Sequence, residues 1–211
     1  MRPTLIVFVK EPRPGRVKTR LARDVGHGAA AQWYRRQCAA LLRRLGRDPR
    51  WRLVLAVSPD AASMASRAWP QSLPRMPQGT GTLGTRMARA LATAGPGPAL
   101  LIGSDIPGAG PREIADAFAA LRGNDAVLGP SPDGGFWLIG LAAGRRLPGT
   151  RLGGAGAGGW RGRLEPVRWS TAHAMADTVA RMAPLRVGLG PELDDVDTLD
   201  DLRALGLPRP W

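Results

Sequence analysis

Residues 4–9, TLIVFV, form an unbroken run of apolar and β-favouring side chains near the amino end of the sequence. A short run without polar alternation is typical of a strand that is buried on both faces of a sheet. Comparable runs occur at 53–57, 99–102 and 126–128, with helical patterns between them. Because strands that alternate with helices are joined by right-handed crossovers, this order predicts an α/β fold with a mostly parallel central sheet.

The segments between these strands carry helical signals. Cys38 falls on the apolar face of segment 29–45, which Gly46 is placed to end. Asp60 suits the N-cap of a helix, and Pro111 suits the first turn of another. We therefore expect helices at 29–45, 60–69, 83–94 and 111–121.

Residues 136–141 form a further apolar run, which follows the strand at 126–128 too closely for a crossover helix. We expect an antiparallel or edge strand there. The segment 144–162 is rich in Gly and Arg, a composition that is typical of a flexible loop. Since 211 residues suit one domain, we expect a single domain over residues 1–211 that includes this loop.

The composition limits the class of protein. No apolar run approaches the roughly 20 residues that a membrane-spanning helix needs, and residues 5–9 are too short for the core of a signal peptide. We therefore expect a cytoplasmic protein without a membrane span. The single cysteine excludes an internal disulfide and a zinc site built from several cysteines.

The sequence is strongly basic, with 30 Lys and Arg against 17 Asp and Glu and a formal net charge of +13. Such a charge can serve nucleic-acid binding. Here the basic residues are scattered, and aromatic residues, which would stack on bases, make up only 5% of the chain. We therefore expect no specific nucleic-acid partner and interpret the charge as a surface that favours small anionic substrates. Binding of arbitrary DNA through bulk charge is a less favoured alternative.

Cations gather in the loop that follows the first predicted strand. Ligands of an open α/β sheet bind beyond the carboxyl ends of the strands, where this loop would lie. It contains the only two lysines of the chain, Lys10 and Lys18, together with Gly15 and Arg20. Backbone amides near a glycine and compact cationic charges bind phosphate, so these residues are predicted to bind a nucleotide. A solvated basic turn is the alternative interpretation.

Carboxylates provide a candidate metal site. Asp105 leaves the buried run 99–102 directly into a loop, where it could hold Mg²⁺ or Mn²⁺ bound to substrate phosphates. The alternative is a cap on the turn before Pro107. Near the carboxyl end, Asp195 or Asp197 could complete the metal site.

The same acidic segment also carries a structural signal, because Thr198 with Asp201 fits a capping box. Two glycine-containing segments are further candidates. Asp133-Gly134-Gly135 combines a carboxylate with residues that let a backbone approach a ligand, although it also fits an ordinary tight turn. Residues 78–86 could contact the edge of a nucleobase, or form a loop and an N-cap.

Several short motifs occur along the chain in a specific order. They are Phe8 to Pro12, Pro14 to Leu21, Gly103 to Pro107, Gly129-Pro130, Asp133 to Gly140, Trp169-Ser170-Thr171 and Asp195 to Thr198. Together they resemble the radical-SAM/selenodomain-associated transferases, a branch of the GT-A nucleotide-diphospho-sugar transferases. The resemblance extends from about residue 5 to residue 205.

The resemblance implies a GT-A fold, a Rossmann-like three-layer sandwich that binds a nucleoside di- or triphosphate with a divalent metal. By analogy Lys18 and Arg20 would hold phosphates, Asp105 would stand in the position of the metal-binding aspartate, and Asp133 would face the acceptor or sugar. The other assigned residues fall into three groups: Gln78, Gly84 and Thr85 for the nucleotide; Gly134, Gly135, Trp169, Ser170 and Thr171 for the substrate; and Asp197 for the metal.

The leading hypothesis is a metal-dependent transferase that uses Mg²⁺ or Mn²⁺, a nucleotide or nucleotide sugar and an acceptor, in the manner of a glycosyltransferase. Lys18 and Asp133 would be its catalytic residues. One alternative is a nucleotidyltransferase that releases pyrophosphate. Another is a non-catalytic nucleotide-binding module, because Thr82 stands where an acidic residue is expected and glycines replace a more apolar segment at 153–159. We expect a monomer or homodimer.

Overall fold

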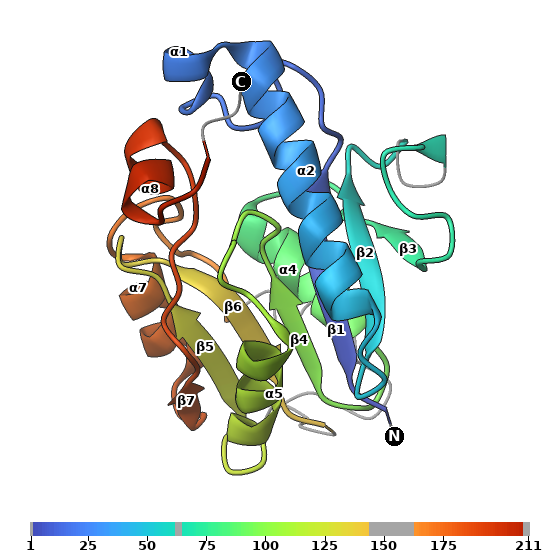
Figure 1. Ribbon diagram of the computed structural model, residues 1–211. Coiled ribbons are helices and arrows are strands. Elements are labelled where there is room, and N and C mark those ends of the chain that lie inside the picture. Colours follow the sequence, from blue (N-terminus) through green and yellow to red (C-terminus); the bar gives the residue numbers. More distant parts are fainter. Residues whose placement is uncertain (1, 62–64, 144–162, 209–211) are drawn as a thin grey trace.

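The computed structural model describes residues 2–61, 65–143 and 163–208 (Figure 1). Within these residues a seven-stranded sheet has the order β3-β2-β1-β4-β6-β5-β7. β6 runs antiparallel to both of its neighbours, and the other pairings are parallel. The strands are β1 Thr4–Lys10, β2 Arg52–Ser58, β3 Arg75–Pro77, β4 Ala99–Ile102, β5 Ala126–Pro130, β6 Phe136–Leu141 and β7 Val187–Leu189.

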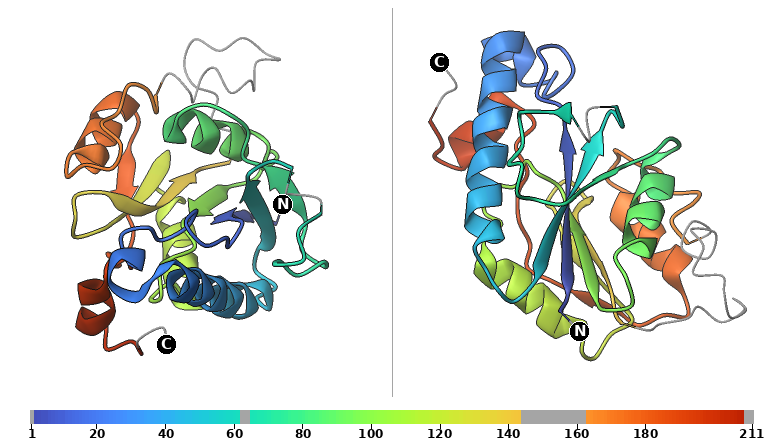
Figure 2. Two further views of the ribbon diagram at one scale, coloured as in Figure 1. Left: turned by 90° about the horizontal axis from the view of Figure 1, so that it is seen from above. Right: turned by 90° about the vertical axis from the view of Figure 1, so that its right-hand side faces the viewer.

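Helices cover both faces of the sheet, which gives the expected three layers (Figure 2). α2 and α5 pack on one face, and α4 and α7 pack on the other. The helices are α1 Ala22–Val25, α2 His27–Gly46, α4 Leu83–Ala92, α5 Pro111–Ala120, α7 Ala174–Met182 and α8 Leu199–Ala204. None of the helices in the described part of the chain combines the length and apolar character that a bilayer crossing requires.

The buried run that opened the sequence analysis supplies both halves of the core. Leu5, Val7 and Val9 pack against the α2 side, whereas Ile6 packs against the α4 side. Because side chains alternate across a strand, a strand covered by helices on both faces must be apolar at every position. This requirement explains why the four predicted central strands are confirmed.

The antiparallel strand predicted at 136–141 is confirmed, but it does not lie at an edge. β6 inserts between β4 and β5, pairing Leu101 with Ile139 on one side and Leu128 with Ile139 on the other. The chain reverses after β5 through a short loop and returns beside it. The parallel β1 and β4, which pair directly, therefore end at the same edge of the sheet as the start of β6.

The helix predicted at 60–69 does not extend over residues 66–70, which are bends and irregular backbone, whereas residue 65 is helical. Arg75 donates to two carbonyl oxygens of this stretch, at 2.9 Å to Ser66 and 2.9 Å to Trp69. Asp60 Oδ1 accepts from the Gly79 amide at 2.9 Å. The flexible loop predicted at 144–162 lies outside the described residues.

Candidate functional site

A cleft of about 510 Å³ lies beyond the carboxyl ends of β1 and β4. The loop after β1, the start of α4 and residues of β6 contribute to its walls. A second hollow of about 270 Å³ extends from it toward the loop between β5 and β6. Asp105, Asp197, Trp169 and Ser170 line both, so the two hollows form adjoining parts of one site.

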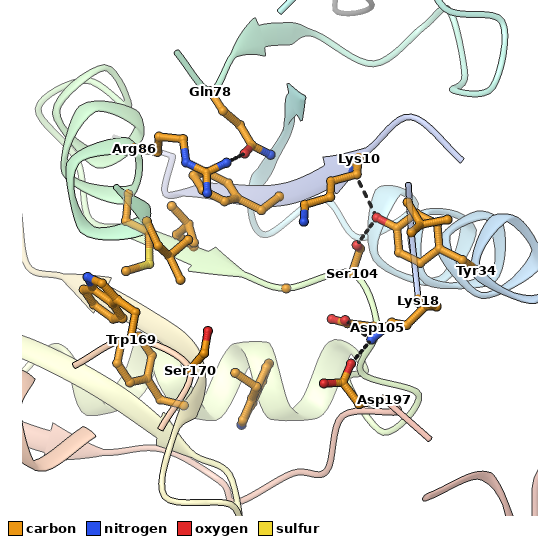
Figure 3. A pocket seen from close by; sticks show the side chains of 18 of the residues that line it. Lys10, Lys18, Tyr34, Gln78, Arg86, Ser104, Asp105, Trp169, Ser170 and Asp197 are labelled. Carbon is orange, nitrogen blue, oxygen red and sulfur yellow. Dashed lines mark hydrogen bonds and ion pairs between the residues drawn. The ribbon is translucent and has the colours of Figure 1, made fainter. Parts of the chain in front are cut away.

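Lys18 is the central cation of the cleft. The buried side chains of Val17 and Leu21 anchor its loop to the core. The Lys18 ammonium group forms ion pairs with Asp105 and, at 2.7 Å, with Asp197 Oδ1, and its side chain is only 5% exposed (Figure 3). Burial alone would lower the pKa of Lys18, but the two carboxylates outweigh it and raise the pKa above the ordinary value. Lys18 therefore carries its charge at neutral pH.

The carboxyl-terminal segment brings the second aspartate to this lysine. Val196 is fully buried, and its amide donates to the Asp105 carbonyl at 3.1 Å. The predicted capping box is confirmed, with the Thr198 hydroxyl accepting from the Asp201 amide and the Asp201 carboxylate accepting from the Thr198 amide. An anchored valine and a capped helix thus fix the backbone on either side of Asp197.

Three carboxylates meet at this point. One oxygen from each of Asp105, Asp195 and Asp197 lies within 4.8 Å of the others. Burial, and next the charge of Asp105, raise the pKa of Asp195 to about 6. Burial also opposes ionisation of Asp197, but Lys18 outweighs it and lowers the pKa of that carboxyl. Carboxylate oxygens in this number and spacing could hold a divalent cation such as Mg²⁺ or Mn²⁺.

Further cations surround the acidic group. Arg20 is 62% exposed and donates to Asp197 Oδ2 at 3.1 Å. Lys10 and Arg16 also line the cleft. The buried Tyr34 hydroxyl accepts from the Lys10 amide at 3.0 Å and lies 2.8 Å from the Ser104 hydroxyl, so it connects the ends of β1 and β4. The site therefore has a cationic rim around an acidic centre.

The other end of the cleft has a different character. In Figure 3 Gln78, Arg86 and Trp169 lie away from the group formed by Lys18, Asp105 and its neighbours. Apolar side chains of α4, β1 and β6 line the cleft here, and the rings of Phe136 and Trp169 meet edge to face with centroids 6.0 Å apart. The cleft is therefore polar at one end and largely apolar at the other.

Glu165 connects the wall that carries Trp169 to the start of α4. Its carboxylate accepts from the Thr82 hydroxyl and, at 3.2 Å, from the Thr85 amide. A carboxylate is stabilised by the free amides and dipole of a helix amino terminus. At Gly84 a Cβ atom would lie 2.1 Å from the Leu164 carbonyl oxygen, so only glycine permits this close approach.

Comparison with protein families decides the relationship of the chain. Over residues 41–171, more than half of its length, the sequence matches the family described as "Uncharacterized protein conserved in bacteria (DUF2064)". The chain belongs to DUF2064. A search of curated proteins gave no match.

Solved structures support this placement. A protein from Desulfovibrio desulfuricans G20, provisionally assigned as a nucleotide-diphospho-sugar transferase, is 32% identical to this DUF2064 member and has a TM-score of 0.82. The alignment covers 97% of this chain and 86% of that chain. The chain is therefore similar to a protein with that provisional assignment, and the association with radical-SAM/selenodomain proteins stays a prediction.

Two more distant structures show the fold. Rv0371c from Mycobacterium tuberculosis H37Rv, in complex with manganese, is 18% identical with a TM-score of 0.53 over 97% of each chain. A CMP:2-keto-3-deoxy-manno-octonic acid synthetase in complex with CTP is 11% identical with a TM-score of 0.53 over 98% of each chain. The predicted GT-A-like α/β arrangement of this DUF2064 member is thus confirmed.

The structure brings most of the residues expected for the site into the cleft. Its lining includes Lys10, Lys18, Arg20, Gln78, Asp105, Trp169, Ser170 and Asp197. The adjoining hollow adds Asp133, Gly135 and Thr171. Four residues expected at the site, Gly15, Gly84, Thr85 and Gly134, are not among the residues that line either hollow.

Gly134 and Gly135 each have a role in the backbone of the loop between β5 and β6. A Cβ atom at Gly134, where φ is 82°, would lie 2.2 Å from the Ala172 carbonyl oxygen, so this glycine permits the approach of segment 169–172. Asp133 Oδ1 accepts from the Gly135 amide at 2.8 Å, which closes a tight turn beside the hollow. The turn and the ligand-facing interpretations of this motif are therefore compatible.

The sequence analysis missed Arg16, Arg86 and Glu165, and it left Asp195 as an option. Arg16 lies inside the predicted phosphate loop, between Gly15 and Lys18, but was not itself assigned to the site. Arg86 is the last residue of the segment considered for nucleobase contact and was not itself assigned either. Glu165 had no signal, because its contact with Thr85 spans 80 positions of sequence.

Proposed function

We propose that this DUF2064 member is a metal-dependent transferase that uses a nucleotide-activated donor, in the manner of a nucleotide-diphospho-sugar transferase. The observation that carries the proposal is the contact of Lys18 with Asp105 and Asp197 inside one cleft. Because the Lys18 ammonium group lies beside these carboxylates, a diphosphate in the cleft would contact both the lysine and a cation held by the carboxylates. The relative at 32% identity, provisionally assigned the same activity, supports the proposal.

The donor set fits Mg²⁺ or Mn²⁺. Asp105, Asp195 and Asp197 offer hard oxygen ligands within 4.8 Å of one another, and burial and next the charge of Asp105 raise the pKa of Asp195 to about 6. The manganese complex of Rv0371c, which shares the fold, supports this choice. When bound, the cation would neutralise charge on the donor phosphates and polarise them.

Side chains of the protein would bind the donor phosphates and activate the acceptor. Lys18, Arg16 and Arg20 would hold the phosphates and stabilise the charge that develops as the bond from phosphate to sugar breaks. Asp133, on the adjoining hollow, would orient the acceptor hydroxyl and accept its proton while the hydroxyl oxygen bonds to the sugar carbon. Nucleoside diphosphate then leaves. Segment 169–171 would complete the wall of the substrate site.

Nucleotidyl transfer is the second candidate. Besides Arg86, four cationic side chains line the cleft, those of Lys10, Arg16, Lys18 and Arg20, and this number suits a triphosphate as well as a diphosphate. In this reaction the acceptor oxygen would attack the α-phosphate and pyrophosphate would leave. The synthetase that shares the fold binds CTP, which supports keeping this reaction in the test.

Product analysis tests the proposal. The purified chain is incubated with nucleotide sugars or nucleoside triphosphates, Mg²⁺ or Mn²⁺ and an acceptor panel, and nucleoside diphosphate and pyrophosphate are measured separately. We expect nucleoside diphosphate, with turnover lost in Asp105→Asn and retained in Asp116→Asn, whose carboxylate is 59% exposed on α5. Pyrophosphate would select the second reaction. Nucleotide affinity that is unchanged by EDTA and by Asp105→Asn would indicate a non-catalytic nucleotide-binding module.

A further inference from the structure

A buried amide fixes a guanidinium group at the apolar end of the cleft. Gln78 is only 2% exposed, and its Nε2 donates to the Val9 and Ala56 carbonyls at 3.1 and 2.8 Å. These two bonds orient the amide, so Oε1 is left to accept, and it accepts from Arg86 Nη1 at 3.0 Å. The Arg86 side chain therefore has a defined position on the cleft wall (Figure 3).

Most donors of this guanidinium group are unused within the described part of the chain. Nε is buried without a hydrogen-bond partner, and no hydrogen bond or ion pair of Nη2 is found there. Because a guanidinium group carries only donors, the groups that could satisfy it are acceptors. With Nε enclosed, the terminal nitrogens Nη1 and Nη2 are the donors that a ligand in the cleft can reach.

The surroundings of Arg86 favour a nucleobase over a phosphate. Phe8, Leu83, Met87 and Trp169 line the same cleft and offer apolar surface to a flat ring. Lys18, Asp105 and Asp197 lie at the other end in Figure 3. A nucleotide that places its phosphates beside Lys18 would extend its base toward Arg86.

We propose that Arg86 is a specificity-determining residue that donates through Nη1 and Nη2 to two neighbouring acceptors of a nucleobase, and so selects guanine or cytosine over adenine and uracil. This inference rests on the nucleotide-binding function proposed above. Guanine offers O6 beside N7, and cytosine offers O2 beside N3. Adenine places an amino donor beside N1 and N7, and uracil places a ring N–H between its carbonyls, so neither matches a pair of donors.

Calorimetric titration with GTP, CTP, ATP and UTP in the presence of Mg²⁺ tests the inference. We expect the wild type to bind GTP or CTP about 5- to 150-fold more tightly than ATP, the range that a bidentate arginine contact supplies. Arg86→Ala should bring the four dissociation constants to within about twofold of one another. Arg86→Lys keeps the charge and a donor for Gln78 but loses the paired donors, so it should lose the same discrimination while remaining folded.

Arg112→Ala is the matched control, because it removes an exposed guanidinium group from α5. Its base preference should equal that of the wild type. The inference is overturned if the wild type binds all four nucleotides equally, or prefers ATP or UTP. It is also overturned if both Arg86 variants weaken the binding of all four nucleotides by the same factor, because this result would indicate that Arg86 contacts the phosphates. Failure of every nucleotide to bind would instead overturn the proposed function, and this inference with it.

Discussion

The ammonium nitrogen of Lys18 lies 2.7 Å from Oδ1 of Asp197, although 179 positions of sequence separate the two residues. The same nitrogen pairs with Asp105, so one lysine joins the loops after β1 and β4 to the carboxyl-terminal segment. The contact therefore holds these three separate segments together at the site. Its energetic and functional consequences can be separated by substitution.

Removal of the Lys18 charge should weaken both folding and nucleotide binding. Lys18→Ala leaves Asp105 without its Lys18 partner and Asp197 with the exposed Arg20, and we expect a loss of about 1–3 kcal/mol in the free energy of unfolding at pH 7. The raised pKa of Lys18 means that this stabilisation is fully present at pH 7 and would fade only above the ordinary lysine value of 10.5. Urea denaturation measures the stability, and calorimetry measures the nucleotide affinity.

Lys10→Ala is the control for this prediction. The exposed Lys10 side chain lines the same cleft and has no ion pair within the described residues. We expect weaker nucleotide binding without a change in stability. Equal stability of the two variants would contradict the structural role given to Lys18.

The stability of the metal-free protein should depend on Asp195 and on pH. The folded pKa of Asp195 is raised to about 6 from 3.8, so the folded state binds the proton more tightly and loses stability as the pH rises between these values. Asp195→Asn removes this cost. Since the side chain is only half-buried, we expect a gain of about 1 kcal/mol above pH 7 that disappears at pH 4.

Urea denaturation of Asp195→Asn and the wild type at pH 4 and pH 7.5 measures this difference. Mn²⁺ should reverse the order, because it would stabilise the wild type more than the variant. A gain that is the same at both pH values would show that ionisation of the half-buried Asp195 is not its cause.

Gly84→Ala tests the close approach of the Glu165 segment to α4. Its Cβ would meet the Leu164 carbonyl oxygen at 2.1 Å and Trp169 Cζ2 at 2.9 Å, so the segment must move. We expect a loss of about 1–3 kcal/mol of stability and a change in tryptophan fluorescence. Gly28→Ala is the control, since a Cβ there has no neighbour within 4 Å and alanine suits the start of α2. Unchanged fluorescence and stability in Gly84→Ala would contradict the packing.

Tyr34→Phe tests the connection between the ends of β1 and β4. The variant leaves the Lys10 amide and the Ser104 hydroxyl without the buried oxygen that each contacts. We expect a loss of about 1–3 kcal/mol in the free energy of unfolding, the range for a buried polar group that loses its partner. Chemical denaturation measures it. A change below about 0.5 kcal/mol would show that water or a shifted hydroxyl replaces the phenol.

The sequence predicted the strands well, because a strand covered on both faces must be continuously apolar, as residues 4–9 and 99–102 are. β3 and β7 were missed, since each has three residues and none of them is buried. The predicted helix at 60–69 does not continue past residue 65, where the Arg75 side chain donates to the carbonyls of Ser66 and Trp69. Such long-range contacts leave no local pattern in a sequence.

The sequence predicted which loops form the site, but it did not predict which side chains contact each other there. Position beyond the strands brought Lys18 and Asp105 together in the prediction. No spacing in the sequence showed that the Gln78 amide would hydrogen-bond to Val9, Ala56 and Arg86. A buried amide among carbonyls is recognised only once the strands are in place.

Linkage between nucleotide and metal binding tests the central claim most directly. Calorimetry measures the dissociation constant of the preferred nucleotide with and without Mn²⁺, in the wild type, in Asp105→Asn and in the control Asp116→Asn. Since the two ligands would meet at one site, we predict that Mn²⁺ tightens nucleotide binding at least about tenfold in the wild type and the control, a coupling of about 1.4 kcal/mol. Asp105→Asn should abolish the effect. Nucleotide affinity in the wild type that is the same with and without Mn²⁺, or no nucleotide binding at all, would contradict the account.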